Sequence, residues 1–545
     1  MQSKYYRTLL PLALLLAACL FLSSPLLDVQ GIGPAKNYIL VFQPQQQTLP
    51  QTVISRGHTV VYDLSAAGVM VVRTHIPDDL IHIPGIISVA PDRPHITIPA
   101  KPTKPLTSGL LHPLQVSSKA EGCASNEAVC PQQWDLERIH VPQAWEKTRG
   151  SRKVRVAVLD SGLTSTHEAL GDNYDKEASK SFVEPTNCAQ DSDVNSLEDF
   201  NGHGTWTALH IAGKNTSRMS GIAPETTLIN LRVLNACGIG TDSWILAALM
   251  HAHKVGAQIV SMSLGGFVCA DGVVKESYYC RTEKDARDGA STWKAYNQTI
   301  SYLLQHGTLV VASAGNEHVQ LDQNGRVMGK SSVGFGAEKN DPSNNLYGLR
   351  EIPAGIPGVL TVSATNRITQ AAQAGETRHG QYGQGLRDQL AYYSNYGARI
   401  DVSAPGGSRN YNVPRFDCIS TRCDGLTPSS SGGDDHTGVF GAFGIDEKGQ
   451  LCSNCYSYLQ GTSMAAPTVS GVAALVLARH PGMSVQELTK LLKRSVTPFL
   501  DKNATPPAAS NSKSPYYNYT IDYDAAPISN HLMGTGIIDA ARAVS

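Results

Sequence analysis

The alternation of short apolar strands with helical segments constrains this chain more than any other feature of its sequence. Apolar runs that end in turn-forming residues predict strands at 154–159, 228–234, 258–262, 310–314 and 359–364. Helical spacing of apolar residues fills 243–253 and 484–493, and Ser484 and Glu487 have the spacing of a capping box. We therefore expect an α/β protein with a doubly wound, mostly parallel sheet that is covered by helices on both faces.

One serine stands where a buried helix is expected to begin. Ser463 lies within the run 461–471, and small apolar residues follow directly from Val472. Its hydroxyl is therefore expected near free backbone N–H groups and the positive end of the helix dipole. Pro467 fits the first turn, where it removes no needed donor. By itself, this pattern also describes a serine that only caps a core helix.

Two further motifs bear on the role of that serine. Asp160 follows the predicted strand at 154–159, at the strand end where open α/β sheets place their chemistry. His203 is bracketed by glycines, which allow close backbone approach, and it opens a helix. A lone aspartate or a lone histidine of this kind also has a purely structural interpretation. Together, the motifs D-S-G, H-G-T and G-T-S-M-A-x-P occur in the order Asp, His, Ser.

This order and these motifs resemble the subtilisin-like serine proteases, or subtilases, from about Trp134 to the C-terminus. The resemblance implies an exported serine endopeptidase with Ser463 as nucleophile, His203 as general base and Asp160 as the residue that orients the imidazole. Peptide bonds would be hydrolysed through an acyl-enzyme intermediate. No cofactor is required for this chemistry, no metal ligands are assigned, and a structural calcium ion is left open.

The resemblance also implies an oxyanion site and a substrate cleft. The backbone N–H of Ser463 and the side chain of Asn316 are the expected donors to the oxyanion. A peptide would add as a strand along one segment and place its side chain against a facing one. The expected substrate-binding residues are Ser263, Leu264 and Gly265 on one wall and Ser313, Ala314 and Gly315 on the other. These residues are small, so we expect other residues to set the base of the pocket.

Several positions depart from the family pattern. Trp206 and Thr468 stand where relatives commonly have histidine, so the packing beneath His203 is expected to differ. Insertions at 268–298, 317–351 and 407–457 follow segments that shape the cleft. They either wall the cleft and narrow specificity or elaborate the surface.

The N-terminus indicates export. Lys4 and Arg7 precede an apolar run from Leu9 to Leu22, which is typical of a signal peptide, here assigned to 1–31. The residues up to Cys19 also resemble a bacterial lipobox, so lipidation of Cys19 and ordinary signal cleavage remain alternatives. The expected location is secreted or in the periplasm or cell envelope. No later run is expected to span a membrane.

A small separate unit precedes the catalytic region. Strands are predicted near 38–42, 58–62, 68–72 and 86–90. The unit at 35–99 resembles the inhibitory propeptide of subtilases, although an unrelated module that is retained in the mature protein is the alternative. Residues 100–132 are predicted to be an exposed linker, and 133–545 the catalytic domain.

Cysteine usage agrees with export. Apart from Cys19, ten cysteines remain, and an even number in an exported chain predicts disulfides. Cys123–Cys130 and Cys269–Cys280 are natural local pairs. Cys452 and Cys455 are predicted to form a structural bridge rather than a zinc site, because a second C-x-x-C is lacking.

Charge narrows the expected partners. The net charge is −1, which gives no reason to expect nucleic acid or an anionic membrane surface as a partner. The expected partners are a protein or peptide substrate and the chain's own propeptide, with membrane contact only through a lipid anchor, and the protein is expected to be a monomer. The alternative function is that of a pseudoenzyme that binds peptides, which the presence of all four catalytic residues disfavours.

Overall fold

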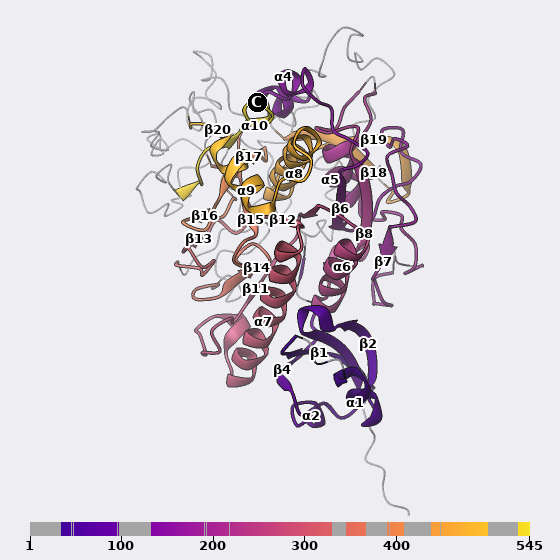
Figure 1. Cartoon of the computed structure of the whole chain (residues 1–545), viewed down its shortest axis with the longest axis vertical. Helices are drawn as coiled ribbons and strands as arrows, with labels where there is room; N and C mark the ends of the chain where they lie inside the picture. The colour runs from indigo at the N-terminus through magenta and orange to yellow at the C-terminus, as the bar shows by residue number, and fades with distance from the viewer. Residues whose placement is uncertain are drawn as a thin grey trace, which may run out of the picture.

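The computed structural model describes residues 34–97, 132–329, 345–366, 390–407, 438–499 and 532–545, apart from single positions at 45, 47, 95, 190, 192, 217, 392 and 447. The predicted signal peptide with Cys19 and the linker up to residue 131 lie outside the described residues. So do Cys123, Cys130, Cys418 and Cys423. A large sheet with its helices carries a smaller N-terminal unit at one end (Figure 1).

The large sheet confirms the predicted α/β architecture. It has nine strands in the order β20-β21-β17-β15-β12-β10-β6-β8-β7. All neighbours pair in parallel except β20 and β21. The strands are β6 (Arg155–Asp160), β7 (Lys180–Ser181), β8 (Thr227–Arg232), β10 (Ile259–Met262), β12 (Leu309–Ser313), β15 (Leu360–Thr365), β17 (Val402–Pro405), β20 (Val496–Thr497) and β21 (Ile537–Ile538).

The chain changes direction across the sheet at β6. After β6 the chain forms β7 and β8 on one side, with β8 next to β6, and then β10, β12, β15 and β17 follow in turn on the other side. Ligands of doubly wound sheets bind outside the carboxyl ends of the strands at such a switch point. The gap between β6 and β10 is therefore where the fold itself places a site.

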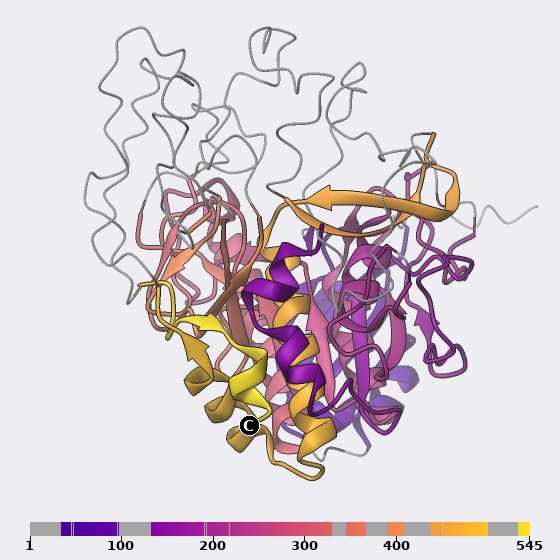
Figure 2. The same ribbon diagram turned by 90° about the horizontal axis from the view of Figure 1, so that it is seen from above.

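Successive residues of a strand point to opposite faces of the sheet. Both sets are apolar in β6, so helices bury them on both faces. Val156 and Val158 of β6 belong to a core shared with α5 (His203–Ala212) and α8 (Thr462–Arg479). Ala157 and Leu159 belong to a second core with α6 (Asp242–Lys254) and α7 (Glu283–Gln305). Figures 1 and 2 show α8 against one face of the sheet, with α6 and α7 on the other.

Helix α8 is long and apolar enough to cross a membrane by length and composition alone. Contrary to the sequence expectation, one later segment therefore passes this test. However, 89% of its apolar window is buried inside the protein. It is the central core helix of the catalytic unit.

The N-terminal unit is an antiparallel four-stranded sheet, β2-β3-β1-β4, with two short helices. All four strands form at the predicted places. One sheet face packs on the unit's own helices, and the other face, with Ile39 and Val41, joins the core of α6 and α7. The elements are β1 (Lys36–Phe42), α1 (Leu49–Ser55), β2 (Thr59–Leu64), β3 (Val69–Thr74), α2 (Pro77–Leu80) and β4 (Ile86–Pro91).

Two polar contacts extend this interface. Asp92, just after β4, accepts hydrogen bonds from the N–H (3.0 Å) and the hydroxyl (2.5 Å) of Ser243 at the start of α6. Further along, β5 (Ile96–Thr97) pairs antiparallel with β9 (Ile239–Gly240) of the catalytic unit. The end of the N-terminal unit therefore continues as a strand on the catalytic unit.

The inserted segments form secondary structure of their own. The hairpin β18 (Val439–Ile445) and β19 (Leu451–Leu459) lies in orange along the upper right of the coloured ribbon in Figure 2. The strand β11 (Gly266–Val268) pairs antiparallel with β14 (Arg350–Ile352). Cys269–Cys280 and Cys452–Cys455 form the predicted disulfides. Cys188–Cys237, which the sequence did not single out, forms another.

Candidate active site

The register of the sheet brings several of the predicted residues together at the carboxyl ends of the strands. Leu159 of β6 lies beside Met262 of β10, which in turn lies beside Ala312 of β12. The next residues along the chain are Asp160, Ser263 and Ser313, respectively. A predicted catalytic residue and both predicted cleft walls therefore emerge side by side at the carboxyl ends of three adjacent strands.

His203 is the first residue of α5, and it contacts Asp160. Its Nδ1 lies 2.8 Å from Oδ1 and 3.0 Å from Oδ2 of Asp160. The close approach depends on glycine, because a Cβ on Gly204 would lie 2.2 Å from the carbonyl oxygen of Gly162. The glycines around His203 and after Asp160 thus allow the two loops to touch.

The environment of His203 suits a general base. Burial lowers the pKa of His203, but the charge and hydrogen bond of Asp160 and the charge of Asp199 outweigh it, so the net pKa is raised. Nδ1 is held by Asp160, whereas Nε2 has no hydrogen-bond partner among the described residues. The ring therefore has one oriented nitrogen and one nitrogen available for proton transfer.

Asp199 is a functional residue that sequence reasoning missed. Its Oδ1 accepts hydrogen bonds from the N–H groups of Asn201 (3.0 Å) and Gly202 (2.8 Å) and from the Ser161 hydroxyl (2.9 Å). Its Oδ2 accepts one from the N–H of Thr205 (2.7 Å). It therefore fixes the turn that presents His203. An aspartate just ahead of a helix start was the available signal.

Ser463 is the second residue of α8, so its N–H is one of those without an intrahelical partner. The side chain is buried, and its hydroxyl lies 3.3 Å from the carbonyl oxygen of Ser263. Trp206 and Met464, which lie close in sequence to His203 and Ser463, pack in one apolar cluster. The beginnings of α5 and α8 therefore share a single environment.

The position of Pro467 differs from the expectation. α8 begins at Thr462, so Pro467 is its sixth residue and not part of its first turn. Its missing N–H would otherwise bond to the carbonyl of Ser463. The hydroxyl of Ser263 donates to that carbonyl instead, at 2.8 Å. A side chain from the predicted cleft wall thus satisfies the group that proline leaves open.

Asn316 is fixed by the residue before Ser463. Its Oδ1 accepts hydrogen bonds from the N–H (2.9 Å) and the hydroxyl (3.0 Å) of Thr462. With the oxygen occupied in this way, the amide Nδ2 is left to donate. The contact links the segment after β12 directly to the start of α8.

Trp206 and Thr468, the two residues expected to alter the packing beneath His203, both contact His210 of the same helix. Trp206 is fully buried and stacks on His210, with ring centroids 4.6 Å apart. The Nε1 of Trp206 donates to the carbonyl of Ser457 in β19 (3.3 Å). A Cβ on Gly202 would collide with the ring of Phe443 in β18. The inserted hairpin therefore packs against the helix that carries His203.

The residues predicted for the two substrate walls lie at the ends of two neighbouring strands of the large sheet. Ser263 and Leu264 follow β10, and Ser313 ends β12 with Ala314 after it; all four are buried. Gly265 and Gly315 are half-buried. A short stretch with main-chain atoms at its surface is suited to binding an extended peptide.

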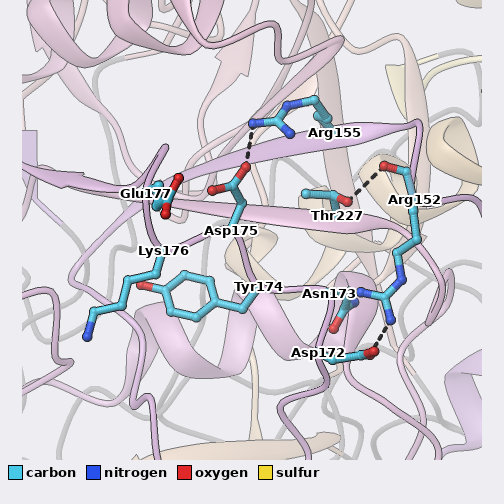
Figure 3. Close-up of a pocket in the computed structure, with 9 residues that line it drawn as sticks. All are labelled: Arg152, Arg155, Asp172, Asn173, Tyr174, Asp175, Lys176, Glu177 and Thr227. Carbon is cyan, nitrogen blue, oxygen red and sulfur yellow. Dashed lines mark hydrogen bonds and ion pairs between the residues drawn. The ribbon is translucent and has the colours of Figure 1, made fainter.

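A separate hollow of about 630 Å³ lies at the opposite ends of the strands (Figure 3). Arg155 and Thr227, which begin β6 and β8, line it, so it lies at the amino ends of the strands. Both of its arginines are paired within the hollow, as Arg155–Asp175 (2.8 Å) and Arg152–Asp172. This hollow is remote from Asp160 and carries none of the predicted chemistry.

Metal ligands do not gather in the described part of the chain. Within those ranges, no group of three or more His, Cys, Asp or Glu side chains could hold a metal ion. The arrangement around Asp160, His203 and Ser463 supports nucleophilic and acid–base chemistry by side chains.

Comparisons with known proteins agree with this geometry. The model of the subtilase family of peptidases (S8) matches residues 151–536. The thermophilic serine proteinase of Bacillus sp. strain AK1 is 27% identical over 64% of this chain and 58% of its own length. Subtilisin of Bacillus pumilus is 25% identical over 67% of this chain and 91% of its own length.

A solved structure shows the same fold. The epidermin leader peptide processing serine protease of Staphylococcus aureus has a TM-score of 0.61 and 19% identity, and the match covers 94% of this chain and 98% of that one. The family match spans most of the chain and includes Asp160, His203 and Ser463. This chain belongs to the subtilase family, whose members are serine endopeptidases.

Proposed function

We propose that this chain is an active, exported serine endopeptidase with Asp160, His203 and Ser463 as its catalytic triad. The observation that carries the proposal is the geometry of His203, whose Nδ1 is held by Asp160 at 2.8 Å while Nε2 has no partner among the described residues. This is the arrangement that a general base for a serine hydroxyl requires.

The reaction follows from these positions. The Ser463 hydroxyl turns from the Ser263 carbonyl towards Nε2 of His203, gives up its proton and attacks the substrate carbonyl. The negative oxygen that forms is stabilised by the N–H of Ser463 and Nδ2 of Asn316. Losing one such donor typically costs about 3 to 4 kcal/mol of transition-state stabilisation. His203 then protonates the leaving amine, and water hydrolyses the acyl-enzyme with the same groups.

A fluorophosphonate probe tests this function. Such a probe forms a covalent bond only with an activated serine. We expect the processed protein to be labelled and the Ser463→Ala variant to remain unlabelled. A Ser470→Ala variant, which alters another buried serine of α8, should still be labelled. Lack of labelling in correctly processed protein would favour the alternative, a peptide-binding pseudoenzyme.

We also propose that the chain is made as a zymogen in which residues 35–99 are an inhibitory propeptide. The apolar interface with α6 and α7 and the strand pairing of β5 with β9 support this role. If it is correct, Ser463→Ala protein should accumulate with the N-terminal unit still attached, whereas wild-type protein is cut within 100–132. Intact but active wild-type protein would favour a module that is retained.

Export is proposed from the signal-like segment at 1–31. The two alternatives for this segment give different products. Signal cleavage alone gives a soluble protein, whereas lipidation of Cys19 gives a membrane-bound one that incorporates labelled palmitate. A Cys19→Ala variant should abolish that incorporation only in the second case.

A further inference from the structure

A buried carboxylate lies between the two walls of the proposed cleft. Glu351 belongs to β14 and pairs with Phe267 of β11, two residues after Gly265. A Cβ built on Gly265 would lie 3.0 Å from Oε1 of Glu351, and one built on Gly315 would lie 2.9 Å from the same oxygen. These glycines belong to opposite walls. The carboxylate therefore lies where both walls converge, and a side chain at either glycine would collide with it.

A second carboxylate stands beside the first. A Cβ on Gly315 would lie 2.6 Å from Oε2 of Glu317. That oxygen accepts a hydrogen bond from Nδ2 of Asn395 (2.9 Å), which also donates to the carbonyl of Ala314 (2.8 Å). Oδ1 of Asn395 accepts from the N–H of Glu317 (3.2 Å). Asn395 thus ties Glu317 to the wall that ends in Gly315.

Neither carboxylate forms an ion pair with another described residue. Oε2 of Glu351 is buried without a hydrogen-bond partner in that part of the chain. Arg350 lies over the ring of Trp293, 5.0 Å from its centroid. Arg399, whose charge acts on Glu351 through space, is bonded to Asp401 at 2.9 Å. The neighbouring cations are therefore engaged elsewhere.

This arrangement is unfavourable for the protein alone. Burial raises the pKa of Glu351 and the charge of Glu317 raises it further, and together they outweigh the hydrogen bond of Asn395 and the charge of Arg399, which lower it. Burial likewise raises the pKa of Glu317. Buried carboxylates are normally paired with a cation or hydrogen-bonded. A positively charged group from a substrate would supply what the protein does not.

We propose that Glu351, with Glu317 beside it, forms the base of the cleft and selects peptides with arginine or lysine on the acyl side of the scissile bond. The inference rests on the proposed endopeptidase function of the same cleft. A long unbranched side chain could pass between the small residues of the two walls. Arginine should be preferred to lysine, because its planar guanidinium can bind carboxylates with two hydrogen bonds.

Matched peptides test the inference on the processed protein. Four internally quenched peptides would differ only in the residue before the cleaved bond, which is Arg, Lys, norleucine or Glu. Each is measured with wild type, Glu351→Gln, Glu317→Gln and the control Glu283→Gln, whose side chain is 88% exposed. We expect kcat/KM for Arg to exceed that for norleucine about 100-fold or more in the wild type. The ratio should fall at least about tenfold in Glu351→Gln, less in Glu317→Gln, and not in the control.

The outcomes separate this inference from the proposed function. A wild-type enzyme that cleaves norleucine as well as Arg overturns the inference, and so does an unchanged ratio in Glu351→Gln. Should Glu351→Gln fail to fold, the wild-type series and Glu317→Gln decide. Fluorophosphonate labelling of each protein runs in parallel. Labelling without a basic preference overturns this inference alone, whereas absence of labelling and cleavage overturns both.

Discussion

Helix α5 carries two histidines, each near a buried aspartate, and only one of them has the features of a catalytic base. His203 bonds to Asp160 through Nδ1, and 12% of its side chain is exposed. His210 lies two turns further on, with Nε2 3.0 Å from the Thr468 hydroxyl and 3.5 Å from Asp135, and its side chain is fully buried.

The two rings differ in which nitrogen is free and in what surrounds it. Among the described residues, Nε2 of His203 and Nδ1 of His210 have no hydrogen-bond partner. A protonated His210 would bury an N–H without an acceptor beneath the stacked Trp206, so the neutral ring is favoured. Accordingly, burial lowers the pKa of His210 to about 3, whereas that of His203 is raised. The same residue types therefore make a candidate base in one place and a core contact in the other.

The largest expected difference is in activity. His203→Gln should lower kcat about a million-fold, because the triad acts as a unit. His210→Gln should leave kcat per folded molecule nearly unchanged and lower the free energy of unfolding by about 1 to 3 kcal/mol. Peptide hydrolysis and urea denaturation would measure the two effects. A large fall in kcat for stably folded His210→Gln would contradict the conclusion that only His203 has the features of a catalytic base.

The next largest fall in kcat should come from substitution of Asp160. Asp160→Asn keeps the shape but favours the wrong imidazole tautomer, so kcat should fall about ten-thousand-fold. Single-turnover kinetics would measure it, with Thr207→Val as the control, since Thr207 touches the same carboxylate at 3.2 Å. Equal losses in both variants would show that the effect is structural and not specific to the imidazole.

The pH dependence distinguishes the two rings without mutation. Because the base must be neutral, kcat/KM should fall about tenfold per unit on acidification, with a midpoint above the ordinary histidine pKa of 6.5. His210 has the opposite shift, so the unfolded chain binds its proton first. Its contribution to stability is present above pH 6.5 and is lost as the pH falls towards about 3. Acid denaturation of wild type and His210→Gln would measure this, and identical pH profiles of stability would contradict it.

The smallest effect should come from Thr468. Thr468→Val removes the hydroxyl that accepts from His210, at a cost of about 1 kcal/mol in the free energy of unfolding. The fluorophosphonate labelling rate should not change. As a reference of similar size, Ser484→Ala removes the capping box of α9 (Val485–Arg494), which forms as predicted and contains neither histidine. A slowed labelling rate in Thr468→Val alone would show that the two histidines are coupled.

Much of the fold could be predicted because its signals are local. The strands β6, β8, β10, β12 and β15 begin and end within two residues of the predicted places, since apolar runs that end in turn residues identify buried parallel strands. The motifs around Asp160, His203 and Ser463 were visible for the same reason. Their relative placement needed the sheet register, which the family resemblance supplied.

The features that the sequence did not reveal depend on contacts between distant residues. The bond from Ser263 to the Ser463 carbonyl joins positions 200 residues apart. The role of that bond becomes clear only once α8 is known to begin at Thr462. Pro467 then lies inside the helix and leaves the Ser463 carbonyl without a helical N–H partner. Glu351 was hidden because it lies in a segment that appeared only as an insertion. Its proposed role depends on its closeness to both Gly265 and Gly315, which no local sequence pattern encodes.

The sequence by itself determined the α/β class, the order of the candidate catalytic residues and the small-residue walls of the cleft, because each depends on residues close together in the chain. Only the tertiary structure decided which histidine is oriented with a free Nε2 and which is enclosed. It alone placed two carboxylates, neither of them ion-paired with a described residue, between the predicted cleft walls. Burial and hydrogen-bond partners set the chemistry of a titratable group, and both come from residues that only the packed fold brings together.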